Sequence, residues 1–248
     1  MNGHRDLIVR IRHLLTLALF TTGLAAHAAT LQISPVMIDL QSNESASGIA
    51  LRNPGDSPLY GQVRVFRWDQ SNGDDTLIPT QELMASPPLV QIAAQTDQLV
   101  RLVRATSAPV AVEQSYRVLI DELPRPDSTP TSGVTIRLRY SVPIFVEPAG
   151  GSGQPKLSWH LARDDHGWVL RVENTGTKRA QIAAVQLVNG AGKAYEINKG
   201  LLGYALAGRT GQWQMPLAPD ADLGGAVKVR AAVNSLPAQA VVTVDQRN

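Results

Sequence analysis

Cysteine is absent from this chain. Without it the chain forms no disulfide and offers no thiolate for catalysis or metal binding. No glycine-rich loop stands between a strand and a helix, which excludes the common phosphate-binding motifs. No amphipathic helix of convincing length occurs, and beyond the first residues no segment approaches a membrane span. These absences favour a β protein without thiol or phosphate chemistry.

Histidine is scarce, because only His160 and His166 lie beyond the N-terminal segment. The two flank a turn, and a metal site would need further ligands held in geometry. Exposed loop histidines are the favoured interpretation, with a metal pair as the alternative. The acidic pairs at 74–75 and 164–165 are typical of solvated turns, and Asp220-Ala-Asp222 lacks the further oxygen ligands of a calcium loop. We expect no catalytic residue, no metal and no cofactor, and therefore no enzyme.

Residues 1–28 have the layout of a secretory signal peptide. Arginines precede the short apolar run 14–20, and Ala26-His27-Ala28 supplies small residues at the expected cleavage position. We predict cleavage after Ala28. A retained anchor is the alternative, disfavoured because Thr21-Thr22-Gly23 interrupts the apolar run. The mature chain is then exported without membrane insertion. It has as many acidic as basic residues, which argues against nucleic-acid binding by broad electrostatic attraction.

The segment 133–148 has the clearest pattern in the chain. Apolar and polar residues alternate along it, and a period of two is typical of a β-strand with one apolar and one solvated face. Pro143 removes a backbone donor, so we expect the part after it to lie at an edge or a bulge. The alternating apolar residues are Val134, Ile136, Leu138, Tyr140 and Val142.

Short alternating strands separated by Pro, Gly and Asn turns continue through most of the chain, starting with the segment 31–40 broken at Pro35. The pattern predicts an all-β fold of two immunoglobulin-like β-sandwich domains without the usual cysteines. Glu147-Pro-Ala-Gly-Gly-Ser-Gly-Gln-Pro155 has the composition of a linker. We therefore expect a first domain at 29–148, a linker at 149–155 and a second domain at 156–248.

Several segments together resemble the periplasmic PapD-like chaperones of the chaperone–usher pilus pathway. The resemblance covers the mature chain and is strongest over 31–148. The order and spacing of the segments are more specific than any one motif, and the resemblance implies an L-shaped pair of sandwiches. The segments are Asn53-Pro-Gly-Asp-Ser-Pro58, Ser86-Pro-Pro-Leu-Val-Gln-Ile92, Gln98-Leu-Val-Arg-Leu102, Tyr116-Arg-Val-Leu-Ile-Asp-Glu-Leu-Pro124, Ile144-Phe-Val-Glu-Pro148 and Leu170-Arg-Val-Glu-Asn-Thr-Gly176.

The resemblance implies that the long strand is lent to a pilus subunit that lacks its last strand. Main-chain hydrogen bonds would join the two proteins, and alternate side chains would fill the subunit's groove. By position, Val134, Ile136 and Leu138 match the donor residues, with Tyr140 as a fourth. The alternative is that they fill only the chain's own core, which we expect for Val142 and Phe145.

One departure from the family concerns the subunit's terminal carboxylate, which an Arg in the first strand and a Lys in the long strand usually anchor. The matching places here hold Val36 or Met37 and Pro143. Either the anchor is absent or another cation replaces it. Arg117 is the candidate, because its strand should run antiparallel to the long strand and bring it opposite the Pro143 end; an ordinary surface arginine is the alternative. Arg101 and Arg104 are weaker candidates. The departure resembles the archaic chaperones that serve spore-coat-U-like subunits.

The resemblance also implies an outer-membrane usher as partner and the periplasm as location. The matching usher-contact positions are Pro58, Tyr60 and Leu123, although an ordinary half-buried turn explains Leu59 and Tyr60 as well. An exported adhesion or scaffold protein of two sandwiches is the alternative function. A pilin is disfavoured because pilins have one sandwich.

Overall fold

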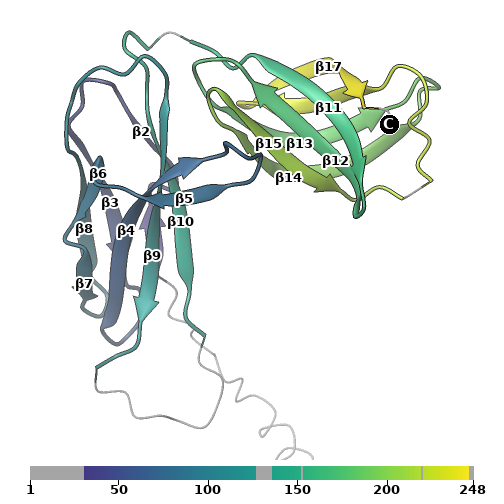
Figure 1. The fold of residues 1–248 in the computed structure, drawn as a ribbon. Coiled ribbons are helices and arrows are strands. Elements are labelled where there is room, and N and C mark those ends of the chain that lie inside the picture. Colours follow the sequence, from purple (N-terminus) through teal and green to yellow (C-terminus); the bar gives the residue numbers. More distant parts are fainter. Residues whose placement is uncertain (1–30, 127–135, 152, 219, 246–248) are drawn as a thin grey trace, which may run out of the picture.

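The computed structural model describes residues 31–126, 136–151, 153–218 and 220–245. The expected signal peptide and Val134 lie outside these residues. Within them every regular element is a strand. The strands form two β-sandwiches that make the two arms of an L (Figure 1). The all-β prediction of two sandwiches is confirmed, while the domain limits drawn from composition stay a prediction.

The first sandwich has a four-stranded and a six-stranded sheet. The four-stranded sheet has the order β1-β3-β8-β6, and the six-stranded sheet has the order β2-β10-β9-β4-β5, with β7 paired to β4. The bounds are β1 Gln32–Ser34, β2 Ile38–Leu40, β3 Ala46–Arg52, β4 Leu59–Asp69, β5 Thr76–Pro79, β6 Leu83–Ser86, β7 Leu89–Ile92, β8 Asp97–Arg104, β9 Gln114–Leu123 and β10 Arg139–Val146.

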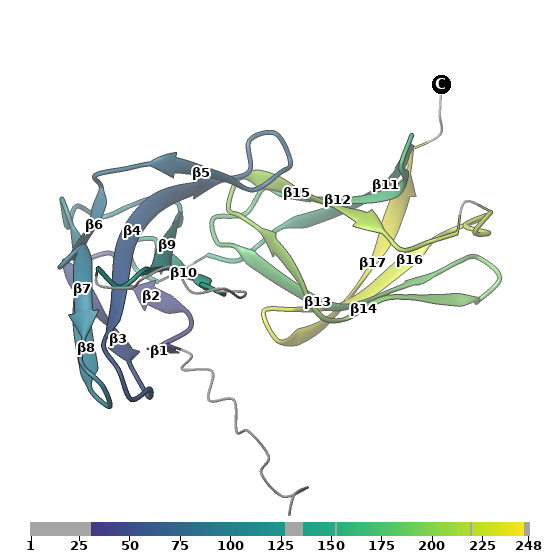
Figure 2. The same cartoon turned by 90° about the horizontal axis from the view of Figure 1, so that it is seen from below.

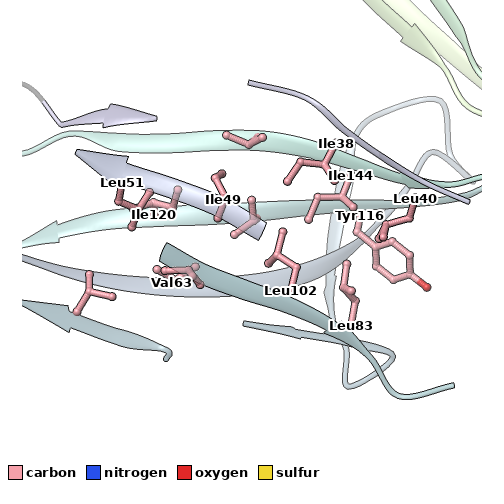
Figure 3. Close-up of a cluster of buried hydrophobic side chains, with 14 of the residues drawn as sticks. Ile38, Leu40, Ile49, Leu51, Val63, Leu83, Leu102, Tyr116, Ile120 and Ile144 are labelled. Atoms are coloured by element: carbon pink, nitrogen blue, oxygen red, sulfur yellow. The ribbon is translucent and has the colours of Figure 1, made fainter. Parts of the chain in front are cut away.

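The strand is interrupted at Pro35, as expected, and there the chain crosses from one sheet to the other. β1 pairs with β3 on one side of the break, and β2 pairs in parallel with β10 on the other. The two sheets face each other (Figure 2). Between them lies a core of alternate strand residues, which Figure 3 shows converging from both sheets. Each such side chain contributes about 1.5–3 kcal/mol by burial. The residues labelled there are Ile38, Leu40, Ile49, Leu51, Val63, Leu83, Leu102, Tyr116, Ile120 and Ile144.

The long strand differs from the prediction in two ways. Strand β10 begins at Arg139, and Ile136–Leu138 lie before it. The part after Pro143 is also not an edge, because β2 pairs with Ile144–Val146 on the side away from β9. The expectation for Pro143 was therefore wrong. The edge lies before the proline, where β2 has not yet begun and β9 is the one neighbour of β10 among the described residues.

Phe145 is buried within the chain as expected, but in a different cluster from Val142. Val142 packs in the first core as expected. Phe145 instead packs with Trp68 of β4 and with Tyr204 and Leu206 of the second sandwich. The reason is the period of two, which directs Phe145 to the sheet face opposite to Val142 and Ile144. The ring thus packs at the junction of the arms.

The second sandwich is one seven-stranded sheet folded around its own core, in the order β14-β13-β16-β17-β11-β12-β15. Strand β17 joins the two layers because it pairs with β16 on one side and, in parallel, with β11 on the other. The bounds are β11 Leu157–Asp164, β12 Gly167–Asn174, β13 Ala180–Val188, β14 Ala194–Ala205, β15 Arg209–Met215, β16 Lys228–Val233 and β17 Leu236–Val244.

Polar contacts fasten the two arms together. Arg179, the residue before the second arm's β13, forms ion pairs with Glu113 (2.6 Å) and Asp39 (2.7 Å). Its guanidinium lies 3.6 Å from the centre of the Phe145 ring. Arg209 pairs with Asp69 at 2.5 Å. Burial raises the pKa of Glu113 above its ordinary value, although Arg179 opposes the shift. The junction therefore depends on buried, partnered charge as well as on the aromatic cluster.

Candidate functional site

The first part of the site is the free edge of β10 and the residues before it. Ile136 is 77% exposed and Leu138 is 38% exposed, so these apolar side chains do not fill the chain's own core. Tyr140 is half-buried and packs against that core. Among the described residues, β9 is the only strand beside 139–143. The edge therefore offers both apolar side chains and unpaired backbone groups.

The second part is a cleft of about 670 Å³ in the angle of the L. The first arm contributes Pro143 and Arg117 to its wall, and the second arm contributes Leu201 of β14 and Trp213 of β15. Val36, Met37 and Ser141 line it too, so the free edge leads into the cleft. Nine further residues complete the lining: Gln70, Gly73, Asp74 and Asp75 from the first arm, and Gln181, Leu202, Gly203, Tyr204 and Gln212 from the second.

Arg117 is positioned in this cleft as the antiparallel pairing requires. It lies directly opposite Pro143 in the ladder, and its guanidinium is 3.7 Å from the centre of the Trp68 ring and 5.8 Å from that of Tyr204. Burial lowers its pKa, and Asp75 opposes the shift. An arginine stays protonated under such conditions. No ion pair of Arg117 occurs within the described part of the chain. The cleft therefore holds a guanidinium that stacks on Trp68 and whose N–H groups are not used in an ion pair.

Two carboxylates stand near Arg117, and both are already hydrogen-bonded. Asp75 accepts from the Gln70 amide at 2.7 Å, and Asp74 accepts from Gln212 at 3.1 Å. They limit how strongly the cleft attracts an anion from a distance. A carboxylate that enters the cleft would therefore be held by direct contact with the guanidinium fork.

Comparison with known proteins agrees with this geometry. The family model described as "Pili and flagellar-assembly chaperone, PapD N-terminal domain" matches residues 30–152. The uncharacterized fimbrial chaperone YhcA of Escherichia coli K12 is 24% identical over 191 residues, which cover 76% of this chain and 81% of YhcA. The chain belongs to the PapD-like pilus chaperones.

Solved structures extend the likeness of this PapD-like chaperone to both arms. One is a chain of the CsuC–CsuE chaperone–tip adhesion subunit complex from the archaic chaperone-usher Csu pili of Acinetobacter baumannii, with a TM-score of 0.68 and 26% identity over 88% of this chain and 100% of that one. Another is a chain of the Salmonella enterica SafA pilin–SafB chaperone complex, with a TM-score of 0.59 and 19% identity over 86% of this chain and 96% of that one. The latter likeness concerns the fold alone.

The other two arginine candidates lie elsewhere in the chaperone. Arg104 is buried, and its guanidinium donates to the carbonyl oxygens of Ser42, Glu44 and Ala108. It thus secures loops of the first arm. Arg101 is exposed on the four-stranded sheet, opposite Gly48 and Ser86. The structure brings neither to the cleft, because both belong to β8, in the other sheet of the first sandwich.

The usher-contact candidates form one group at the far end of the chaperone's first arm. Tyr60 lies directly opposite Leu123 in the β4–β9 ladder, and Pro58 is two residues before Tyr60. Leu89 was missed from the sequence. It is 61% exposed on β7, opposite Gln62. The Pro87-Pro88 pair before it is typical of the start of an edge strand and could have drawn attention to Leu89.

Neither a metal centre nor a membrane helix is seen in the part of the chaperone that the structure describes. No three His, Asp or Glu side chains come together there as metal ligands, and no helix has the length and apolarity to cross a bilayer. The family is one of chaperones and not of enzymes.

Proposed function

We propose that this chaperone acts in the periplasm and caps pilus subunits by lending them the edge at 136–142. The observation that supports the proposal most is the exposure of Ile136 and Leu138 on a segment whose second edge is open. An edge of this kind invites another strand. Tyr140 and Val134 complete the alternating donor set by their spacing in the sequence.

Donation is energetically reasonable at this edge. Side chains two residues apart point to the same face, so Ile136, Leu138 and Tyr140 would enter successive places of an open groove. Each fully buried side chain contributes about 1.5–3 kcal/mol, from which the cost of ordering the two chains must be subtracted. Main-chain hydrogen bonds to the free side of β10 would add affinity without demanding a particular subunit sequence.

Arg117 is proposed as the anchor of the subunit's terminal carboxylate. It lies in the cleft to which the free edge leads and has no anionic partner of its own among the described residues. A planar guanidinium binds a carboxylate through two parallel hydrogen bonds. Val36, Met37 and Pro143 at the usual places carry no charge, so this anchor would set the chaperone with the archaic branch.

The group of Pro58, Tyr60, Leu123 and Leu89 is proposed as the usher-binding surface. It is apolar, partly exposed and at the end of the first arm away from the cleft. The subunit's carboxylate in the cleft and an usher at this group would therefore occupy different places on the chaperone.

Co-expression tests the donor role. Each pilus subunit encoded beside the chaperone gene is exported with tagged chaperone, and the complexes are purified and weighed. Wild type should recover a one-to-one complex. Ile136→Asp/Leu138→Asp should abolish recovery, because two charges would have to enter an apolar groove. The matched control is Val241→Asp, at a residue that is 66% exposed on the second arm. Equal recovery by the donor variant would refute the proposal.

A further inference from the structure

The first half of the proposed donor edge, residues 136–141, is not held in place by burial. Residues 142–146 are buried, whereas 136–139 and Ser141 are exposed. Only β9 lies beside this half among the described residues. A segment with few buried contacts and one neighbouring strand is expected to fray. Some other interaction must keep it extended if it is to receive a partner strand.

Asp121 and Glu122, near the end of β9, contact this same half from opposite faces of the sheet. The Asp121 carboxylate accepts a hydrogen bond from Arg64 of β4 at 2.6 Å and a further one from Arg139, the first residue of β10. Asp121 thereby joins three neighbouring strands on one face. Its side chain is only 15% exposed, so the pairs are partly shielded from solvent.

Glu122 contacts the segment on the other side. Its carboxylate lies 3.4 Å from the Leu138 amide nitrogen and 3.4 Å from the Tyr140 hydroxyl, both of which donate to it. Its own amide donates to the Leu138 carbonyl at 3.1 Å. Two adjacent carboxylates therefore contact Leu138, Arg139 and Tyr140 in turn. Since neighbouring residues of a strand point to opposite faces, the segment is held on both.

The protonation states agree with this arrangement. Burial alone would raise the pKa of Asp121, but hydrogen bonds from Arg139 and Arg64 hold it below its ordinary value. Burial and the neighbouring Glu122 raise the pKa of Tyr140 to about 12. At neutral pH, Asp121 is thus a charged acceptor and the Tyr140 hydroxyl a donor.

We propose that Asp121 and Glu122 are positioning residues that hold residues 136–141 extended against β9 before a subunit arrives. The proposal rests on the donor role proposed above. A binding-competent conformation that is only partly populated weakens apparent affinity by that fraction. If loss of both carboxylates leaves the segment extended in about a tenth of the molecules, the apparent dissociation constant for a subunit rises about tenfold.

Hydrogen exchange of the free chaperone tests the proposal directly. The variant is Asp121→Ala/Glu122→Ala, and Asp121→Asn/Glu122→Gln is the conservative form that keeps shape and part of the hydrogen bonding. Exchange at 136–141 should become at least several-fold faster in the Ala variant and less so in the conservative one, while β8 and β11 keep wild-type protection. Asp97→Ala is the matched control, because Asp97 forms an exposed cross-strand pair with Arg52 (3.0 Å) in the other sheet.

The outcomes separate this inference from the donor role. Unchanged exchange at 136–141 would overturn it, and so would faster exchange throughout the first arm, which would indicate general destabilisation. The second measurement is binding of each co-encoded pilus subunit to the variants. If wild type binds a subunit and the Ala variant binds it equally well, the positioning role is wrong while donation stands. If wild type binds none, the donor role itself is wrong.

Discussion

Pro143 lies directly opposite Arg117 across the β9–β10 ladder, and both line the cleft between the arms. The strand that we propose to be lent therefore carries no cation at this point, whereas the neighbouring strand carries Arg117. Trp68 lies under the guanidinium and restricts its position. Compared with the lysine of the long strand that the family resemblance implies, the positive charge here lies on the neighbouring strand and lines the same cleft.

Substitution of Arg117 should weaken subunit binding without unfolding the chaperone. Arg117→Ala is expected to lose about 1.5–3 kcal/mol of binding, as for a hydrogen bond to a charged group. Arg101→Ala removes the same charge from the other sheet and should leave the affinity as it is. Arg104→Ala should also act less on the affinity, although loss of its three carbonyl contacts should lower stability. Titration of purified subunit–chaperone pairs measures the difference, and equal losses for Arg117→Ala and Arg101→Ala would contradict the anchor.

The buried carboxylate at the junction should make stability depend on pH. The folded pKa of Glu113 is raised above its ordinary 4.5, so the folded state binds its proton more tightly than the unfolded chain does. Its contribution is complete below about pH 4.5 and is lost as pH rises through the folded pKa. The pKa values of Asp121 and Asp69 are lowered from 3.8, so their contribution to stability is complete above that pH. It is lost as pH falls below about 3.8.

Urea unfolding at several pH values isolates the Glu113 effect. The free energy of unfolding of wild type minus that of Glu113→Gln should fall as pH rises above 4.5, because Gln cannot titrate. The same difference measured for Glu173→Gln, on the exposed face of β12, serves as the comparison. A difference that stays constant over this range would show that Glu113 ionises in the folded chaperone as it does in the unfolded chain.

Gln70 should determine how firmly the arms are joined. Its buried amide donates to the Tyr204 carbonyl at 2.7 Å, and its oxygen accepts from the Leu206 amide at 2.9 Å. Gln70→Leu leaves both backbone groups buried without a partner, at a cost of about 1–3 kcal/mol each. Small-angle scattering should show a broader distribution of arm orientations, and exchange at 204–206 should rise. Gln91→Leu, at an exposed position of β7, should change neither the scattering nor the exchange. Wild-type scattering and exchange in Gln70→Leu would exclude this role for Gln70.

Loss of the proposed usher surface should separate delivery from capping. Tyr60→Ala/Leu123→Ser should still yield subunit–chaperone complexes, because these residues belong neither to the cleft lining nor to the proposed donor set. Surface pili, counted by electron microscopy, should fall at least tenfold. Leu77→Ser alters an exposed leucine elsewhere on the same arm and should leave pili at wild-type number. Loss of the complexes along with the pili would instead assign Tyr60 and Leu123 to subunit binding.

The sequence by itself determined the all-β fold and the position of the alternating segment that we propose as the donor. Both follow from local alternation, since a period of two specifies a strand and its apolar face without knowledge of its neighbours. It also placed Arg117 opposite Pro143, because antiparallel pairing of two adjacent strands in the chain leaves little freedom of register.

Only the tertiary structure decided which part of the long strand is an edge. Whether a backbone group is free depends on the partner strand, and β2 comes from residues about a hundred positions earlier. The same holds for Phe145, whose ring meets Tyr204 of the other arm, and for Arg104, whose guanidinium donates to the distant carbonyls of Ser42 and Glu44. The contacts of Asp121 and Glu122 also depend on strands brought together by folding, so no local pattern announces them.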